Sequence, residues 1–494
     1  MTTPPKQAMT RRRVLELLGT SGLAAVTAGL LAACGSTATS GGTTAGTTAA
    51  SKGTVSASSE GASVSSAGTA TASTAVSTSV ITPVSTSSSA VQVAGAVQLT
   101  FSTWGAGGDA FSAEHKAVAA FNQAHTDIQA QVLQIPFNVY RDKLLAALAG
   151  GDAPDNMAID HDMFPFMVQK DVFARLDPLV SHDKTVLDDY FPSALQGMSY
   201  QGALYGLPTG GSAYYLFWSP RLFQEAGLAT PNDLMAKGQW TWPAFLDAAQ
   251  KLTQGAGTPS AQYGADTGLN LSAIAPWVWS NDGAYLSADQ RQLQLDQPAA
   301  IDAIQFLHDL IWKEHVMPPL GTAPGAIKSF IAGKLAMHLN WGGTGIAQFQ
   351  AVKDLSWDVA LPPSKDGKTF VTWAPLNPMC INKQAKHAEQ SWTFERWYNG
   401  TPGMQVFSQN GRVPVARSVL TAPEYLQATP PAHKQVVLEG MQVGKPAFTN
   451  PNWTLASEKL TPFLTDIGKN TMPVADAMKQ AVALANPILA GQSQ

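Results

Sequence analysis

The chain is poor in cysteine: Cys34 and Cys380 are the only two in 494 residues. Two thiols form at most one intramolecular disulfide, and Cys34 lies in an N-terminal segment with a different chemistry, considered below. A fold held by a disulfide framework is therefore excluded. Hydrophobic residues make up 45% of the chain, so we expect the folded part to be stabilised by an apolar core.

Charge is scarce as well, since Asp, Glu, Lys and Arg together make up 13% of the residues. The 35 acidic residues slightly outnumber the 31 Lys and Arg residues, which gives a formal net charge of −4. Nucleic-acid binding depends on clustered Lys and Arg that neutralise phosphates, and the sequence after residue 33 has no such cluster. We therefore expect no nucleic-acid partner.

Common catalytic and cofactor motifs are missing too. The sequence has no HExxH, no GxSxG and no P-loop, and the glycines after Trp104 lack the GxGxxG spacing of dinucleotide sites. We therefore predict a protein that is not an enzyme and that binds no cofactor.

One short acidic motif leaves an alternative open. His161 lies between Asp160 and Asp162. A metal site needs more ligands than one such triplet supplies, so we predict no metal. Two carboxylates across a glycosidic bond are also the machinery of glycoside hydrolysis. A secreted glycan hydrolase is therefore the alternative from another functional class.

The N-terminus carries an export signal. Arg11, Arg12 and Arg13 precede an apolar run that ends in Leu31-Ala-Ala-Cys34. This pattern is typical of a secretory signal peptide, here residues 1–33, and its end resembles a bacterial lipobox with Cys34 as the lipidated residue. The arginines also resemble a twin-arginine signal, which leaves the export route open. No later run of 18 apolar residues follows, so the sequence predicts no further membrane span.

The next segment, residues 34–96, consists almost entirely of Ser, Thr, Ala, Gly and Val. Such a segment cannot bury enough apolar surface to offset the entropy of ordering it, so we predict a disordered tether. A random coil of this length spans roughly 45 Å. Together with the lipid on Cys34, the tether would hold a folded part at the extracytoplasmic face of the bacterial cell membrane.

Residues 97–494 are too long for one small core and suggest two packed lobes. Strand-like and helix-like patterns alternate along this part, which is typical of an α/β fold. The clearest strand patterns lie at 97–101, 156–160 and 335–340, and the clearest helix patterns at 144–148, 242–252 and 301–311.

Tryptophan is the most suggestive residue type, with 13 in the chain. Indole faces pack against the C–H faces of sugar rings, while Asp, Asn and Arg bind the hydroxyl groups. A buried wedge between elements is the alternative role for any one of them. The tryptophans that we expect in loops, and so near a ligand, are Trp104, Trp277, Trp279, Trp341, Trp373 and Trp453.

Five segments in order carry a family resemblance. They are the segment from Tyr140 to Asp155, Leu204-Tyr-Gly-Leu-Pro208, Leu222-Phe-Gln-Glu-Ala-Gly227, Thr241-Trp-Pro-Ala-Phe245 and Phe330-Ile-Ala-Gly-Lys-Leu-Ala-Met337. On these residues the chain resembles the family 1 extracellular solute-binding proteins of ABC importers, relatives of the maltose-binding and glycerol-3-phosphate-binding proteins.

The resemblance implies a two-lobe α/β fold of the type II periplasmic-binding-protein kind, with the lobes joined by crossing hinge strands. It places the first crossing at 208–212 and a second at 362–371. The expected division is 97–208 with 364–425 for lobe 1, and 209–363 with 426–494 for lobe 2.

The resemblance also implies ligand contacts in the cleft, to which the tryptophan argument adds Trp104, Trp277 and Trp279. Where many relatives have Tyr-Asn, this chain has Trp218-Ser219, so contacts near there do not carry over. The predicted substrate-binding residues are Trp104, Tyr140, Asp160, His161, Asp162, Ser212, Trp277, Trp279, Asn340, Trp341, Trp373 and Arg412.

The predicted function is capture of a neutral sugar or oligosaccharide for delivery to an ABC importer, whose permease subunits are the implied partners. Glycerol 3-phosphate or a phosphodiester is the alternative ligand, but an anion requires concentrated cations and Arg412 is the only conspicuous one. A surface adhesin is a third possibility. We expect a monomer.

Overall fold

The computed structural model describes residues 95–104, 112–182, 184–322 and 325–492. All of them belong to the compact unit 83–494. The predicted signal peptide, the lipidation site Cys34 and the tether before residue 95 lie outside the described residues, so these remain predictions. Within the described ranges, no helix is long and apolar enough to cross a bilayer.

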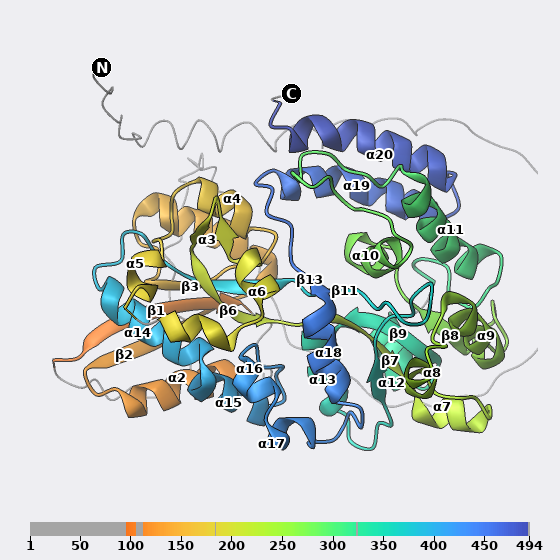
Figure 1. Cartoon of the computed structure of the whole chain (residues 1–494), viewed down its shortest axis with the longest axis horizontal. Coiled ribbons are helices and arrows are strands. Elements are labelled where there is room, and N and C mark those ends of the chain that lie inside the picture. Colours follow the sequence, from red (N-terminus) through yellow and green to blue (C-terminus); the bar gives the residue numbers. More distant parts are fainter. Residues whose placement is uncertain (1–94, 105–111, 183, 323–324, 493–494) are drawn as a thin grey trace, which may run out of the picture. The chain divides into compact units, whose positions relative to one another are not determined.

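One part of the unit, here the first lobe, is built on a five-stranded sheet in the order β2-β1-β3-β12-β6 (Figure 1). β1 is parallel to β2 and β3, whereas β12 is antiparallel to β3 and β6. The carboxyl ends of β1, β3 and β6 therefore meet at one edge. The strands are β1 (Val97–Trp104), β2 (Ile128–Ile135), β3 (Asn156–Ala158), β6 (Gly206–Gly211) and β12 (Leu376–Ile381).

The other part, here the second lobe, is built on a four-stranded sheet in the order β10-β7-β9-β8. β9 runs antiparallel to β7 and parallel to β8. Two small sheets, β4-β5 and β11-β13, complete the described strands. The bounds are β7 (Tyr214–Trp218), β8 (Tyr263–Asp266), β9 (Leu335–Trp341), β10 (Asp358–Ala360), β4 (Ser199–Tyr200), β5 (Ala203–Leu204), β11 (Thr372–Trp373) and β13 (Gly444–Lys445).

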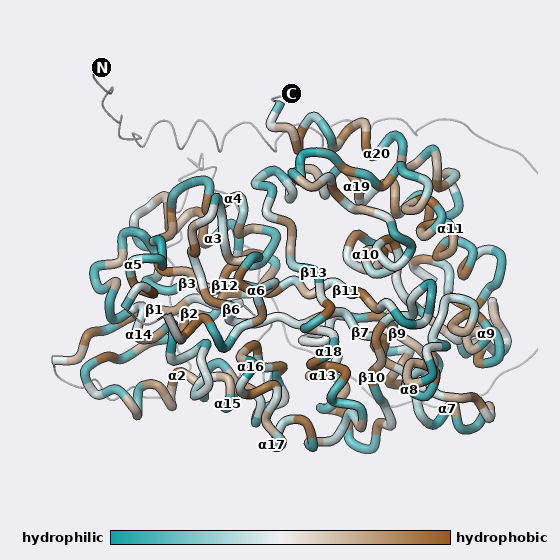
Figure 2. The backbone as a smooth tube through the Cα atoms, in the orientation of Figure 1, coloured by the Kyte–Doolittle hydropathy of each residue, from teal (hydrophilic) through white to brown (hydrophobic). Residues whose placement is uncertain are grey.

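Helices pack around the two main sheets. Figure 2 shows hydrophobic residues along the strands that the helices cover. Those on the first-lobe side are α2 (Ser112–Ala124), α3 (Phe137–Gly150), α4 (Phe164–Gln169), α5 (Asp177–Val180), α6 (Pro192–Gly197), α14 (Ala388–Asn399), α15 (Thr401–Gln409), α16 (Arg417–Leu420) and α17 (Pro423–Leu426), with a 3₁₀ turn at Lys184–Asp189. The remainder are α7 (Pro220–Glu225), α8 (Pro231–Ala236), α9 (Trp242–Leu252), α10 (Leu271–Ser280), α11 (Pro298–Trp312), α12 (Ala326–Ile331), α13 (Gly342–Gln350), α18 (Gln435–Val443), α19 (Trp453–Gly468) and α20 (Val474–Leu489).

The predicted local patterns correspond to real elements. α3 ends where Gly151 adopts a left-handed conformation with φ 82°, which glycine reaches without steric cost. The Thr241 hydroxyl accepts a hydrogen bond from Ala244 N at the start of α9, as the sequence indicated. The strand pattern at 335–340 is β9, and it ends at Trp341.

The chain crosses between the two main sheets at Ser212 and Ala213, which lie between β6 and β7. This position agrees with the first predicted crossing. The predicted second crossing, 362–371, lies in the segment that connects β10 to β12. Its first part still packs on the second lobe, since Ser364 N donates to Trp240 O and Ser364 bridges Thr241. The chain returns to the five-stranded sheet only after β11.

Candidate functional site

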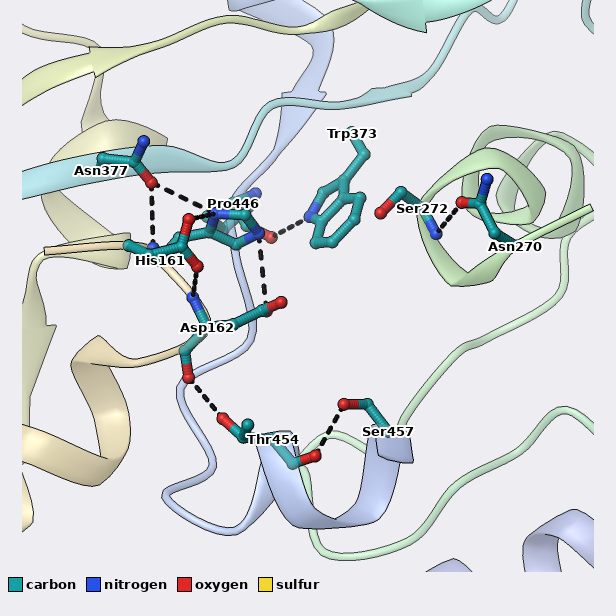
Figure 3. A network of polar contacts seen from close by, with 10 residues as sticks. His161, Asp162, Asn270, Ser272, Trp373, Asn377, Pro446, Thr454 and Ser457 are labelled. Atoms are coloured by element: carbon teal, nitrogen blue, oxygen red, sulfur yellow. Dashed lines mark hydrogen bonds and ion pairs between the residues drawn. The ribbon is translucent and has the colours of Figure 1, made fainter. Parts of the chain in front are cut away.

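An acid–histidine cluster lies at the carboxyl end of β3, at the edge of the first-lobe sheet. The His161 ring is 3.8 Å from Asp160 Oδ2 through Nδ1 and 3.5 Å from Asp162 Oδ1 through Nε2. The Asn377 amide oxygen accepts a hydrogen bond from His161 N at 2.9 Å and lies 3.2 Å from His161 Nδ1. Asn377 therefore orients the imidazole between the two carboxylates (Figure 3).

The charges of this cluster influence one another. Burial alone would lower the pKa of His161, but the carboxylates of Asp160 and Asp162, with the hydrogen bond to Asn377, raise it above its usual value. Burial raises the pKa of Asp162, against the opposing effect of His161. A histidine that carries its proton more readily keeps the cluster closer to neutral, which suits hydrogen bonding to an uncharged ligand.

The same three residues could also offer one ligand atom each to a metal ion, since these atoms lie within 4.8 Å of one another. Three ligands from one turn fall short of the four to eight that zinc or calcium takes, and Asn377 already occupies one side of the His161 ring. The absence of a metal site stays a prediction.

Residues of the second lobe and of the crossing segments face the acid–histidine cluster. The Trp373 ring lies edge-on to His161 with centroids 5.5 Å apart, and it stacks on Tyr214 at 6.0 Å. The Trp373 indole N–H donates to Pro446 O at 3.2 Å, which fixes the ring. In Figure 3 the side chains of Asp162, Trp373 and Ser272 point toward one shared space.

Helix α19 contacts the acid–histidine cluster from the second lobe. The Thr454 hydroxyl donates to Asp162 O at 2.7 Å, and the Ser457 hydroxyl lies one turn further along the helix. Burial raises the pKa of Tyr214, a hydrogen bond with Ser272 lowers it, and the charges of Asp162 and Asp160 raise it further. An aromatic ring and several hydroxyl groups therefore face the carboxylates.

A cavity of about 270 Å³ lies next to this cluster and shares Asn377 with it. Trp104 lines it from the end of β1, and Trp341 lines it from the end of β9. Its charged lining residues are Glu114 and Arg412, whose side chains form an ion pair with Nη2 and Oε1 2.6 Å apart. The cavity thus has aromatic rings from both lobes and no net charge.

Trp341 is held in position by its neighbours. Its indole N–H donates to Ser212 O at 2.8 Å, and its backbone N–H donates to Asn340 Oδ1 at 2.8 Å. The next residue, Gly342, packs so closely that a Cβ atom there would contact the Tyr215 ring and lie 2.6 Å from Ser212 Oγ. The crossing segment at Ser212 therefore sets the orientation of Trp341.

The structure brings together most of the predicted ligand contacts. The acid–histidine triplet and the Trp104–Trp341 cavity with Arg412 lie at the facing edges of the two lobes. Trp373 contacts His161 there, but it is 3% exposed and packs in the second-lobe core. Ser212 is fully buried and contributes its carbonyl to Trp341, so it supports the site from behind.

Three predicted contacts are placed elsewhere. Tyr140 is 1% exposed, and its hydroxyl is bonded to Ser102 and donates to Ala158 O, so it belongs to the core. Trp277 and Trp279 were expected in a loop, which is wrong: both lie inside α10, capped by Asn270, with Pro276 tolerated in the helix. Trp277 is 1% exposed and Trp279 8%, because the helix packs both against the second-lobe core.

Trp453, also expected in a loop, is the first residue of α19 and is 2% exposed. Its alternative role, a buried wedge, is the one that the packing favours. Tyr214, Ser272, Glu114, Asn377 and Thr454 were not singled out from the sequence. Only Tyr214 carried a local signal, since it follows the first crossing by two residues.

Comparisons with known proteins also indicate a binding protein. The sequence profile of the family described as bacterial extracellular solute-binding protein matches residues 116–433. An arabinooligosaccharide-binding protein from Halalkalibacterium halodurans is 26% identical over 45% of this chain and 48% of that protein. One from Bacillus subtilis is 24% identical over 62% of this chain and 70% of its own length. The chain thus matches only about half the length of the first relative.

Solved structures support the fold. An ABC substrate-binding protein from Listeria monocytogenes in complex with cycloalternan has a TM-score of 0.69 at 22% identity, covering 79% of this chain and 98% of that one. This likeness confirms the predicted two-lobe α/β fold of the periplasmic-binding-protein kind. At this identity it bears on the fold alone.

Proposed function

Since this chain belongs to the family of bacterial extracellular solute-binding proteins, we propose that it captures a neutral sugar or oligosaccharide between its two lobes and delivers it to an ABC importer. The relatives named as arabinooligosaccharide-binding proteins support a sugar as the ligand class. The family is one of binding proteins, so neither the hydrolase alternative nor the adhesin alternative is carried further.

The main observation behind the proposal is that the facing edges of the two lobes carry complementary groups, hydrogen-bond acceptors on one and aromatic rings with hydroxyl groups on the other. The first lobe presents the carboxylate of Asp162, a hydrogen-bond acceptor for sugar hydroxyl groups. The partly exposed ring of Tyr214 faces it, stacked on Trp373, which is itself 3% exposed and supports Tyr214 from behind, and Ser272 adds a hydroxyl group. Apolar ring faces and hydroxyl groups alternate on a sugar in the same way, so the two kinds of contact are satisfied together.

The charge balance argues for an uncharged ligand. A phosphate taken out of water must be paired with cations. Arg412, the one cation among the predicted contacts, is already paired with Glu114. The nearby Asp160 and Asp162 would repel a phosphate, and His161 balances only part of their charge. Glycerol 3-phosphate is therefore not the ligand that these residues favour.

Capture requires the two lobes to move relative to each other. The facing groups come from separate sheets joined at Ser212–Ala213 and through the β11 and β13 segments, so a rotation there opens and closes the space between them. Affinity in the micromolar range corresponds to about −8 kcal/mol. A few hydrogen bonds and two or three ring contacts are sufficient for this.

The proposal extends to location and partners. Extracytoplasmic placement agrees with the family, and lipid attachment at Cys34 with a tether at 34–96 would keep the binding unit beside its permease. We propose that the protein acts as a monomer. Radiolabelled palmitate incorporated into the wild-type chain and absent from Cys34→Ala would test the anchor.

Calorimetric titration of the full-length chain with neutral mono-, di- and trisaccharides and with glycerol 3-phosphate tests the ligand class. We expect saturable one-to-one binding to a sugar and none to the phosphate. Trp341→Ala should remove most of the affinity, whereas Trp312→Phe, a helical tryptophan remote from the cavity lining, should keep it. Binding to glycerol 3-phosphate alone, or to nothing in the series, would contradict the proposal.

A further inference from the structure

Phe137, the first residue of α3, has an unusual exposure. Among the described residues, five large apolar side chains are exposed, and Phe137 is the most exposed of them at 59%. Its neighbours in the helix do not explain this, because Tyr140 and Leu144 are buried. The Phe137 ring contacts Trp104, which lines the cavity, so the exposed ring lies beside the aromatic lining.

The position of Phe137 in the helix explains how the ring comes to be exposed. Phe137 precedes the buried Tyr140 by three residues, so the two side chains are neighbours on one side of α3. Both rings contact Trp104, with centroids 5.9 Å away for Phe137 and 5.2 Å for Tyr140. The first turn of α3 therefore extends past the end of β1, and Phe137 continues the aromatic surface that Trp104 presents to the cavity.

A contact between the lobes shows which way this turn faces. Arg141, one turn after Phe137, is 3.9 Å from Glu458 of α19 through Nη1 and Oε1. Glu458 lies one turn after Thr454, which bonds to Asp162 O. Leu455, between them, is another of the exposed large apolar residues, at 46%. Phe137 and Leu455 therefore lie within one helical turn of the place where Arg141 and Glu458 meet, each on its own lobe.

We propose that Phe137 and Leu455, together with the Arg141–Glu458 pair, form an outer subsite that binds a further sugar ring of an oligosaccharide. Phe137 supplies the flat apolar face, Leu455 closes the opposite side, and the two charged groups bond to hydroxyls. The pair has no net charge, like the Glu114–Arg412 pair of the cavity, so the ring it takes is uncharged. This inference rests on the proposed function and makes the ligand an oligosaccharide.

The test is a chain-length series measured by calorimetry on the full-length chain. The probes are arabinose, arabinobiose and arabinotriose, with glucose, maltose and maltotriose as a second series. In the wild type, we expect affinity to rise with length in one of the series. In Phe137→Ala, the affinity for the longest binding sugar should fall about tenfold, as loss of an aromatic contact implies, while the affinity for the shortest binding sugar stays unchanged.

Two further variants distinguish a stacking role from a structural one. Phe137→Trp should keep or strengthen the length dependence, whereas Phe137→Leu should weaken it, because only a flat ring stacks on a sugar. Leu484→Ala removes a comparably exposed apolar residue on α20 and should change no affinity. Thermal unfolding of each variant near the wild-type midpoint shows that the fold is kept.

Other outcomes overturn the inference in distinguishable ways. If Phe137→Ala lost equal affinity for short and long sugars, or lost affinity for none, the outer subsite would be contradicted and the proposed function would stand. A wild type that binds a monosaccharide as well as its oligomers would do the same. A wild type that binds no sugar of any length would remove both the proposed function and the subsite.

Discussion

The two lobes present different chemistry to the space between them. The first-lobe edge carries ionisable groups: the Asp160–His161–Asp162 cluster and the Glu114–Arg412 pair. The facing edge of the second lobe carries rings and hydroxyl groups, mainly Tyr214, Trp341, Ser272 and Thr454. The carboxylates of the acid–histidine cluster thus come from the first lobe, whereas the rings come from both lobes, because Trp104 lines the cavity from the end of β1.

The two edges are also supported differently. On the first lobe, the buried Glu395 of α14 accepts a hydrogen bond from Leu207 N just before the crossing. On the second lobe, Trp341 is positioned by close packing of Gly342 on Tyr215 and Ser212. The comparison suggests that electrostatic changes affect the first edge and changes in volume affect the second.

The largest effect is expected on the stability of the second-lobe edge, where Gly342 is closely packed. Gly342→Ala would force a methyl group against the Tyr215 ring and Ser212, so we expect a loss of about 1–3 kcal/mol in the free energy of unfolding. Sugar affinity should fall with it, because Trp341 is the preceding residue. Gly210→Ala is the matched control for stability alone, since no atom lies within 4 Å of its added Cβ but the residue lines the cavity. Urea unfolding of both variants is the measurement.

The electrostatic support of the first edge is tested at Glu395. Glu395→Ala leaves the buried Leu207 N–H without a partner and should cost about 1–3 kcal/mol in the free energy of unfolding. Glu395→Gln keeps a carbonyl acceptor and should cost much less. Equal losses in the two variants by urea unfolding would show that packing, not the hydrogen bond, matters at this position.

Glu395 also predicts a pH dependence. Burial raises its pKa well above the usual value, so the neutral form is favoured in the folded state. Its contribution to stability is therefore present below the unfolded pKa and is lost as pH rises through the folded pKa. The unfolding free energy of Glu395→Gln, relative to wild type, should rise as the pH increases from the unfolded pKa of about 4.3. A constant difference across that range would contradict this.

A smaller effect is expected on the free energy of binding at the ionisable edge. Asp162→Asn keeps an amide oxygen as acceptor but removes its charge, so sugar binding should weaken by about 1 kcal/mol, the difference between a charged and a neutral hydrogen bond. Asp247→Asn, an exposed acid on α9 paired with Lys251, is the matched control and should leave affinity unchanged. Calorimetric titration compares the two, and equal affinity would remove Asp162 from the site.

The smallest effect is expected from His161. Its pKa is raised by Asp160 and Asp162, with the Asn377 hydrogen bond, although burial opposes this. The stabilisation is complete below the unfolded pKa of about 6.5 and is lost as pH rises through the folded pKa. Between pH 6 and 8 the wild type should therefore lose stability relative to His161→Gln. Parallel pH profiles of the thermal midpoint would contradict this.

Much of the architecture could be predicted because its signals are local. The helix start at Thr241, the helix end at Gly151 and the alternation in β9 each depend on neighbours within a few residues. The contact that holds the start of the second crossing on the second lobe could not be predicted, because it joins Ser364 to Trp240, more than 100 positions away. Local pattern carries no information about such a contact.

The sequence by itself determined the family, the two-lobe α/β fold and the acid–histidine triplet, because these follow from composition, periodicity and the order of short motifs. Only the tertiary structure decided which tryptophans face the space between the lobes. Trp341 at the end of β9 lines the cavity, whereas Trp277 within α10 is buried. It also paired Arg412 with Glu114, 298 positions apart. Burial and pairing depend on which distant segments pack together, and an amino-acid pattern does not specify that locally.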